Sequence, residues 1–272
     1  MKTRILVAVV LIPLLLIVLL ALPKVCTAIL FGVMGALAAY ELLHNTGYIK
    51  HPRLLAYAMI SAFAVSLWSF YGRSYVWGMV GLLVLMVILF TEMMCSHVKL
   101  RFETAVMCLV AGVLIPVLFC SLVRIQAVAG TGRYFVLIPF IIAFLSDSGA
   151  YFIGCRFGKN KLAPAISPTK SIEGVFGGLA GAALGMLIFS LILQFACGFQ
   201  VNYLYAVVYA LIGSVACTFG DLCFSVIKRQ TGLKDYGDLI PGHGGILDRF
   251  DSMMVVGPLI EVFLTLLPLA VK

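Results

Sequence analysis

Two carboxylates in the C-terminal half of the sequence, Asp147 and Asp221, each lie inside an apolar run. Charged side chains are costly inside a bilayer and mark functional sites by default. Asp221, Ser225 and Lys228 are spaced i, i+4 and i+7, which places them on one face of a helix. The spacing predicts a carboxylate, a hydroxyl and an ammonium aligned toward one surface. An Asp–Lys pair that only neutralises a buried charge gives the same pattern.

A polar segment extends from Lys228 to Asp251 and holds four Asp, four Lys or Arg, five Gly, a Pro and a His. A solvated loop is the common interpretation of such a charge run. However, Pro-Gly-His-Gly-Gly at 241–245 suits turns with positive φ and close approach of a ligand to the backbone. Asp248 and Asp251 open the apolar run that follows, near a helix N-terminus. We expect Asp221 and Asp248 to share a divalent cation, because Mg²⁺ takes hard carboxylate oxygens.

A second polar segment, from Cys155 to Glu173, carries four basic residues and one acid. This charge favours phosphate, although loops that only set membrane topology have the same composition. The segment is not a Walker loop, because Gly158-Lys159 is followed by Asn and the required earlier glycine is Ile153. Carboxylates for a metal, cations for phosphates and a lipid-facing position predict phosphoryl or nucleotidyl transfer to a lipid. A phosphate-monoester acceptor arrives ionised, so this chemistry needs positioning and charge neutralisation and no general base.

The elements that must position these residues are membrane spans. Of the 272 residues, 63% are hydrophobic and 11% charged, against about 45–50% and about 25% in soluble domains. This composition excludes a soluble protein, a disordered chain, a coiled coil and a secreted disulfide scaffold. The eight cysteines form no C-x-x-C pair and are interpreted as packing residues. A spanning helix needs about 20 apolar residues, and nine segments fit: Ile5–Leu22, Val25–Leu43, Leu54–Tyr71, Tyr75–Met94, Thr104–Val123, Tyr134–Gly154, Gly174–Gly198, Tyr203–Ile227 and Asp251–Val271.

Lys and Arg are unevenly divided between the two sides that nine spans create. Fourteen of the 19 fall on the N-terminal side and five on the other. Because cytoplasmic loops are enriched in these residues, we expect a cytoplasmic N-terminus and a C-terminus outside. The net charge of +8 is attributed to loops facing anionic lipid or substrate, and not to nucleic acid. The predicted fold class is an all-α polytopic membrane protein.

The acids divide the chain in two. All six Asp lie at position 147 or later, whereas residues 1–132 contain three acids, Glu41, Glu92 and Glu103. We therefore interpret residues 1–132 as transmembrane scaffold and residues 133–272 as the catalytic region, with cytoplasmic loops at 155–173 and 228–250. Five glycines between positions 174 and 185 have the small-xxx-small spacing that permits close helix approach.

The segment from Ser225 to Asp251 resembles the signature of the phosphatidate cytidylyltransferase family, also called CDP-diacylglycerol synthases. It reads S-x-x-K-R-x4-K-D-x-G-x2-I-P-G-H-G-G-I-x-D-R-x-D, with 16 fixed positions in 27 residues. Upstream, D-S-G-A-Y and S-P-T-K-S-I-E-G are similar to the family's D-T-G-A-Y and S-P-x-K-T-x-E-G. Ser148 and Ser171 replace the usual Thr and keep the hydroxyl. The resemblance extends in length and hydropathy over the whole chain.

The resemblance implies a Mg²⁺-dependent enzyme of phospholipid biosynthesis that converts CTP and phosphatidate to CDP-diacylglycerol and pyrophosphate. It implies a homodimer in the cell membrane, with the active site facing the cytoplasm and no nucleic-acid partner. Asp221 and Asp248 would hold the metal centre, with room for a second cation such as K⁺. The remaining implied site residues are Lys228, Arg229, Lys234 and Arg249 on phosphates, Asp235, His243 and Asp251 in the loop, and Asp147, Tyr151, Ser167, Lys170 and Ser225 around the nucleotide and the lipid phosphate.

Other functions fit parts of this pattern. A secondary transporter would also have Gly-interrupted helices with intramembrane acids, but the charge cluster lies in loops and no internal repeat is visible. A CDP-alcohol phosphotransferase would need D-G-x2-A-R, and the chain has no Asp-Gly pair. An enzyme that activates another lipid phosphate or a polyprenol fits the same residues. For His243, a phosphate donor, a metal ligand and a loop brace remain open, and Glu261 is either a structural partner or a site residue.

Overall fold

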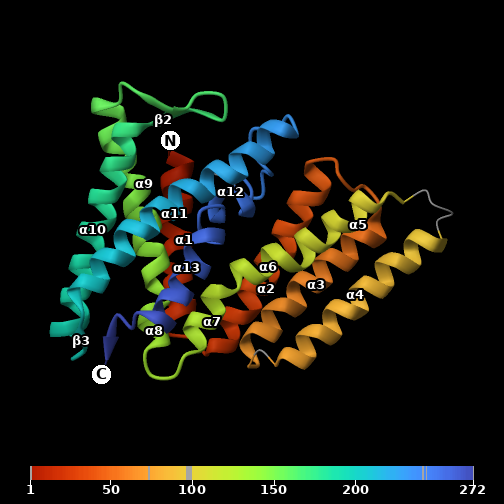
Figure 1. The fold of residues 1–272 in the computed structure, drawn as a ribbon, viewed down its shortest axis with the longest axis horizontal. Helices are drawn as coiled ribbons and strands as arrows, with labels where there is room; N and C mark the ends of the chain where they lie inside the picture. Colours follow the sequence, from red (N-terminus) through yellow and green to blue (C-terminus); the bar gives the residue numbers. More distant parts are fainter. Residues whose placement is uncertain (1, 73, 96–99, 241, 243, 272) are drawn as a thin grey trace. The chain divides into compact units, whose positions relative to one another are not determined.

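The structure is a computed structural model that describes residues 2–72, 74–95, 100–240, 242 and 244–271. The fold is helical (Figure 1) and divides into two compact units. Unit 1 consists of residues 1–133 and 230–250, and unit 2 consists of residues 134–229 and 251–272. The polar segment at 230–250 therefore packs with the N-terminal helices, although it follows a helix of unit 2 in the sequence.

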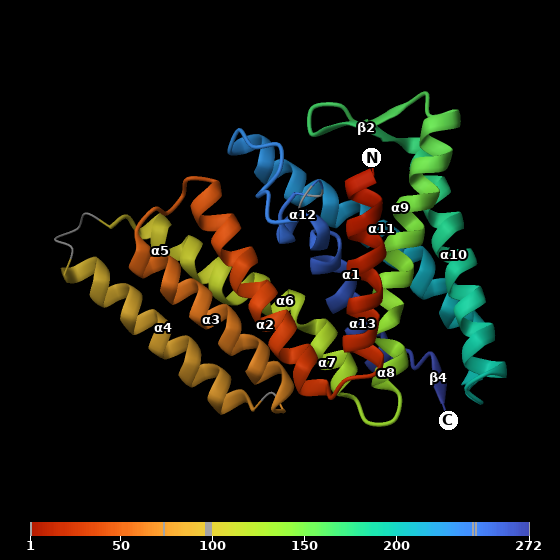
Figure 2. The same ribbon diagram turned by 180° about the vertical axis from the view of Figure 1, so that it is seen from behind.

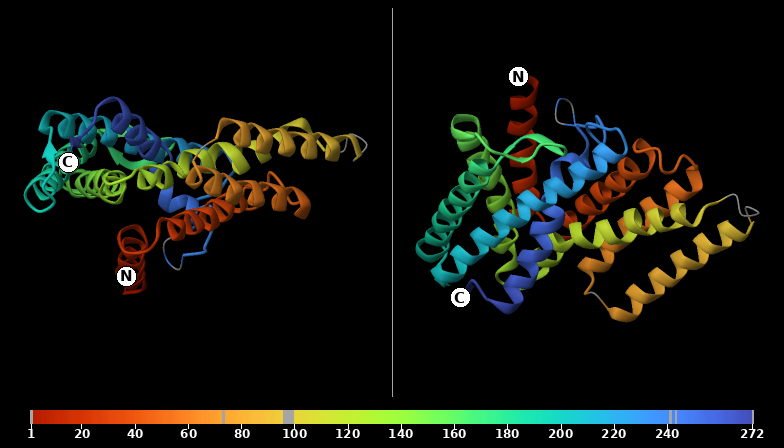
Figure 3. Two further views of the ribbon diagram at one scale, coloured as in Figure 1. Left: turned by 90° about the horizontal axis from the view of Figure 1, so that it is seen from below. Right: turned by 45° about the horizontal axis from the view of Figure 1, so that its top comes forward.

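Unit 1 contains the helices of the first half of the chain and one short helix from the polar segment. In this unit α2 and α3 pack along their length and α4 lies beside α3 (Figure 3). The rings of Phe31 and Phe119 lie 4.9 Å apart, and those of Phe119 and Phe250 lie 5.2 Å apart, so aromatic packing anchors the short helix. The elements are α1 (Lys2–Leu20), α2 (Lys24–Tyr40), a π-helix η1 (Glu41–Asn45), α3 (Pro52–Phe70), α4 (Tyr75–Cys95), α5 (Phe102–Leu109), a second π-helix η2 (Val110–Leu114), α6 (Ile115–Phe119), α7 (Ser121–Ala127) and α12 (Ile246–Phe250).

Unit 2 is built around two helices, α9 (Leu137–Phe157) and α10 (Ile172–Phe195), that run side by side (Figures 1 and 2). Glycine permits their close approach, because a Cβ at Gly177 would lie 2.5 Å from the carbonyl oxygen of Gly149. This contact confirms the packing predicted from the glycine spacing. The unit also contains α11 (Tyr203–Gln230), α13 (Met253–Leu266) and a pair of antiparallel strands, β3 (Gln200–Val201) and β4 (Ala270–Val271). The short helix α8 (Gly132–Phe135) includes the sequence boundary between the two units.

A β-hairpin joins α9 to α10 within the segment predicted as a loop at 155–173. Strands β1 (Lys161–Ala163) and β2 (Ser167–Ser171) pair antiparallel. The hydroxyl of Ser171 caps α10 by accepting a hydrogen bond from the Gly174 amide at 3.1 Å. The Glu173 carboxylate accepts from the amides of Lys159 and Asn160 at 3.2 Å. These contacts attach the base of the hairpin to the first turn of α10.

The helices confirm the predicted class of an all-α polytopic membrane protein, apart from the short strands. Among the described residues, seven helical segments are long and apolar enough to cross a membrane, and Val9–Leu20 and Met253–Leu266 are shorter apolar helices. The predicted ninth span, Asp251–Val271, is longer than the helix found there. Helix α13 ends at Leu266, because Pro268 disfavours helical backbone in the residue before it, and the chain continues into β4.

Candidate active site

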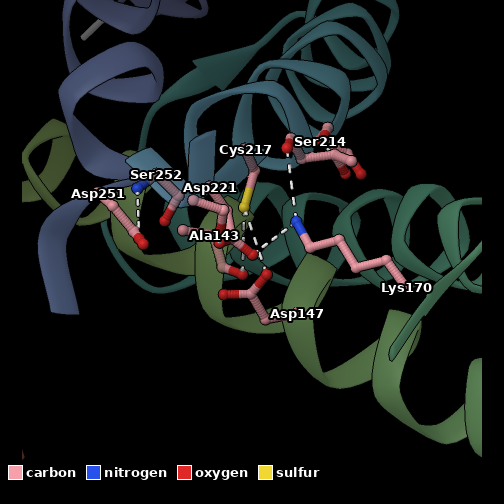
Figure 4. A network of polar contacts seen from close by, with 10 residues as sticks. Ala143, Asp147, Lys170, Ser214, Cys217, Asp221, Asp251 and Ser252 are labelled. Carbon is pink, nitrogen blue, oxygen red and sulfur yellow. Dashed lines mark hydrogen bonds and ion pairs between the residues drawn. The ribbon is translucent and has the colours of Figure 1, made fainter. Parts of the chain in front are cut away.

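Asp221 on α11 is the centre of a polar cluster in unit 2. Its Oδ2 atom lies 2.5 Å from Nζ of Lys170, which comes from strand β2 (Figure 4). The hydroxyl of Ser225 donates to Oδ1 of Asp221 at 3.2 Å, so these two side chains share the helix face that their spacing predicts. Lys170 also donates to the carbonyl oxygen of Thr218 at 3.5 Å. The Lys170 ammonium is therefore held at α11 by both a side chain and the backbone.

Asp147 reaches the same cluster from α9. Its Oδ1 atom accepts a weak hydrogen bond from the thiol of Cys217 at 3.5 Å (Figure 4). Cys217 is buried one helical turn before Asp221, so it has a polar contact in addition to the packing role predicted for it. A hydrogen bond of 2.8 Å between the buried hydroxyls of Ser146 and Ser214 holds α9 against α11 just beside this contact.

Asp251 approaches the cluster from the turn before α13, outside the membrane-crossing helices. Its Oδ1 atom accepts from the amide of Ser252 at 2.7 Å (Figure 4), and its side chain is buried. Burial, together with the charges of Asp221 and Asp147, raises the pKa of Asp251 to about 7, while the nearby Lys228 opposes the shift. Three carboxylates from three segments thus meet in this cluster, and the charges of Asp221 and Asp147 act on Asp251.

This donor set fits a hard divalent cation. Mutual repulsion among carboxylates is relieved when a cation binds between them. Within the part of the chain that the structure describes, no group of three or more His, Cys, Asp or Glu side chains is placed so that it could hold a metal ion by itself. Mg²⁺ is usually held by one or two carboxylates and by substrate phosphates, so a partial carboxylate site is the arrangement expected for it.

Asp248 lies in unit 1, in the first turn of α12. Its Oδ2 atom accepts from the amide of Tyr236 at 2.7 Å and from the amide of Gly245 at 3.0 Å. The carboxylate is buried. By binding both amides it holds Tyr236 and Gly245 together and closes the loop between them, which we call the polar loop. The positive φ angles predicted for the glycine run are found at Gly242 (76°) and Gly244 (88°). Asp221 and Asp248 belong to different units, and the metal that they would share remains a prediction.

The carboxylate of Glu41 is the second buried acid at this loop. Its Oε1 atom accepts from the amide of Ile246 at 2.9 Å and its Oε2 atom from the amide of Leu247 at 2.8 Å. Sequence reasoning gave Glu41 no role. The available signal was that Glu41 is one of three acids in residues 1–132 and lies inside a predicted span.

The remaining predicted site residues lie on α9, β2, α11, the loop before α12, and α12 itself. Lys228 is buried near the end of α11, and Arg229 next to it donates from Nε to the carbonyl oxygen of Ile166 at 3.1 Å, which ties α11 to the hairpin. Tyr151 is exposed on α9 and Ser167 is half-buried in β2. Lys234 and Asp235 are exposed on the loop of unit 1, Arg249 is exposed on α12, and His243 lies outside the described residues.

The fold defines a polytopic membrane protein whose acidic and basic side chains gather in a cluster on α9, β2 and α11 and in a second cluster at α12. A model of the Cytidylyltransferase family matches residues 2–267, and the chain belongs to this family. This membership confirms the family recognised from the signature at Ser225–Asp251.

Curated relatives agree in name over most of the chain. A phosphatidate cytidylyltransferase of Bacillus subtilis (strain 168) is 33% identical over 246 residues, which cover 89% of this chain and 90% of the relative. One of Staphylococcus haemolyticus (strain JCSC1435) is 37% identical over 183 residues, covering 67% and 68%. One of Staphylococcus aureus (strain COL) is 45% identical over 133 residues, covering 49% and 50%.

Proposed function

We propose that this chain transfers cytidylate from CTP to phosphatidate and releases pyrophosphate, as the names of its relatives state for them. An oxygen of the lipid phosphate forms a bond to the α-phosphorus of CTP, and the bond from that phosphorus to the β-phosphate oxygen breaks. The products are CDP-diacylglycerol and pyrophosphate, and the reaction serves phospholipid biosynthesis. The observation that carries the proposal is the cluster of Lys170, Asp221, Asp147 and Asp251, which supplies both charges needed to bind a metal-bound phosphate.

The chain's own side chains bind and orient two anions that otherwise repel each other. Lys170 is paired with Asp221 at 2.5 Å. When a phosphate binds beside this pair, the Lys170 ammonium can bind a phosphate oxygen in place of the carboxylate. Lys228, Arg229, Lys234 and Arg249 add positive charge for the phosphates of CTP and the lipid. Asp221 and Asp248 would hold Mg²⁺, which when bound neutralises charge on the phosphates. No side chain has to remove a proton, because the attacking phosphate monoester is already ionised.

The membrane arrangement of this proposal has nine spans, a cytoplasmic N-terminus and a C-terminus outside. Seven long apolar helices and two shorter ones support this count, and the distribution of Lys and Arg supports the orientation. The active site then faces the cytoplasm, where CTP enters, and phosphatidate arrives laterally from the inner leaflet. Residues 1–132 act as scaffold for the catalytic region at 133–272. The working enzyme is a homodimer, and a second cation such as K⁺ would complete the metal centre held by Asp221 and Asp248.

The test is turnover of detergent-purified protein with CTP and Mg²⁺ across a panel of lipid phosphates. We expect lipid-linked cytidylate with phosphatidate and little with a polyprenyl phosphate. Preference for the polyprenyl phosphate would assign the chain to a related reaction. Absence of product from well-folded protein with every lipid phosphate and nucleotide would favour an ion-coupled transporter.

A further inference from the structure

We propose that Glu41 is a positioning residue for this reaction: it fixes the backbone that carries Asp248. The inference rests on the proposed function, in which Asp248 holds the metal. It gives a role to a residue of the N-terminal half, which the sequence alone presents as scaffold.

Glu41 and Asp248 bind consecutive amides of one turn. Asp248 accepts from Gly245, and Glu41 accepts from Ile246 and Leu247 through separate oxygen atoms at 2.9 and 2.8 Å. These amides immediately precede Asp248 and lie where α12 begins, at Ile246, and the first amides of a helix have no partner within it. The Glu41 carboxylate therefore sets the direction of the first turn of α12, and with it the direction of the Asp248 side chain.

The loop is shaped around the Glu41 carboxylate. A Cβ at Gly245 would collide with the carboxylate oxygens of Glu41, and a Cβ at Gly237 would lie 3.0 Å from Oε1. The π-helix η1 also places Asn45 at the loop, where its Nδ2 atom donates to the carbonyl oxygen of Tyr236 at 2.6 Å. Gly245 is thus required because the Glu41 carboxylate lies against it. At this position the glycine makes room for Glu41, and no ligand is needed to explain it.

The charges argue that this contact does more than cap a helix. Glu41 and Asp248 are 4% and 8% exposed, and their two carboxylates accept hydrogen bonds from neighbouring amides of one turn. A neutral Ser, Thr or Asn caps a helix without placing a second buried negative charge beside the first. Two carboxylates at one turn place two negative charges side by side, and the proposed metal would offset these charges.

The experiment replaces Glu41 by Gln and measures steady-state kinetics and amide hydrogen exchange on the full-length protein in detergent. Glu41→Gln keeps the shape but turns an NH₂ group toward one of the two amides, so one hydrogen bond is lost and two donors face each other. We expect kcat to fall at least about tenfold, with the KM values for CTP and phosphatidate changed less than about twofold. The Mg²⁺ concentration for half-maximal rate should rise, and the amides of Ile246 and Leu247 should exchange faster.

Glu92→Gln is the matched control. Glu92 is another acid of residues 1–132, and it accepts a hydrogen bond from the hydroxyl of Tyr57 at 3.0 Å on helices away from this loop within unit 1. We expect wild-type kinetics for it. Gly245→Ala provides a second route, because its methyl group displaces the Glu41 carboxylate; its effect on kcat should not add to that of Glu41→Gln.

Three results would overturn the inference. The first is wild-type kcat in Glu41→Gln. The second is a loss of activity that matches the loss of folded protein, with unchanged Mg²⁺ dependence. The third is unchanged exchange at Ile246 and Leu247, which is decisive even if the wild-type protein shows no turnover with CTP and phosphatidate and the proposed function itself fails.

Discussion

Replacement of Asp248 by Asn distinguishes two roles of this residue: a carboxylate that holds a metal, and a side chain that only stabilises the loop. Oδ2 of Asp248 accepts hydrogen bonds from Tyr236 and Gly245, and an Asn oxygen can accept both. Hydrogen bonds to a charged group contribute about 1.5–3 kcal/mol and neutral ones about 0.5–1.5 kcal/mol. The change therefore costs roughly 1 kcal/mol per bond, or roughly 2 kcal/mol of stability in all.

Turnover should fall much further than stability. Loss of a metal-holding carboxylate should reduce kcat by more than about a thousandfold, equivalent to about 4 kcal/mol of transition-state stabilisation. The assay is the initial rate of CDP-diacylglycerol formation in detergent micelles, with gel filtration and thermal melting to establish that the variant is folded. Asp238→Asn, which removes an exposed acid from the same loop, is the control and should keep wild-type activity. A rate for Asp248→Asn within about tenfold of wild type would show that Asp248 only stabilises the loop and does not hold the metal.

Three further changes test the packing, the cluster and the topology. Gly177→Ala should lower stability by about 1–3 kcal/mol by overpacking α9 against α10. Gly81→Ala on α4, where a Cβ meets open space, is the control and should be neutral or slightly stabilising. Equal melting temperatures for the two variants would contradict the close packing of α9 and α10. Lys170→Met should lower kcat/KM by about tenfold to hundredfold, because it leaves Asp221 without its 2.5 Å partner, and steady-state kinetics near those of wild type would exclude the role given to Lys170. The exposed Cys155 should react with a membrane-impermeant maleimide in inside-out vesicles and not in right-side-out vesicles, and labelling from the outside would reverse the topology.

Local features of this protein could be predicted from the sequence. Apolar length identified the helices, since α9, α10 and α11 each overlap a predicted span. Helical spacing placed Asp221 and Ser225 on one face, and their hydrogen bond follows from it. Glycine spacing indicated that another helix approaches α10 closely, and α9 is that helix. Each of these depends on residues close together in the sequence.

Long-range partners could not be predicted in this way. Lys170 and Asp221 are 51 positions apart, and nothing in the pattern around Asp221 selects Lys170 over Lys228 as its partner. Glu41 and Ile246 are separated by 205 positions, and their contact depends on how the polar loop folds back onto α2 and η1. The hairpin at 161–171 lacks the alternation of apolar and polar residues that predicts strands. It is held instead by contacts to the end of α11 and the start of α10.

The most direct test of the central claim follows the α- and γ-phosphates of CTP separately in one reaction. Purified protein is incubated with phosphatidate, Mg²⁺ and CTP labelled with ³²P at either position. Cytidylyl transfer predicts that the α-label appears in the lipid phase and the γ-label in pyrophosphate, in equal amounts and at equal rates. Release of the γ-label as inorganic phosphate, or an α-label that never enters the lipid, would contradict the proposed reaction.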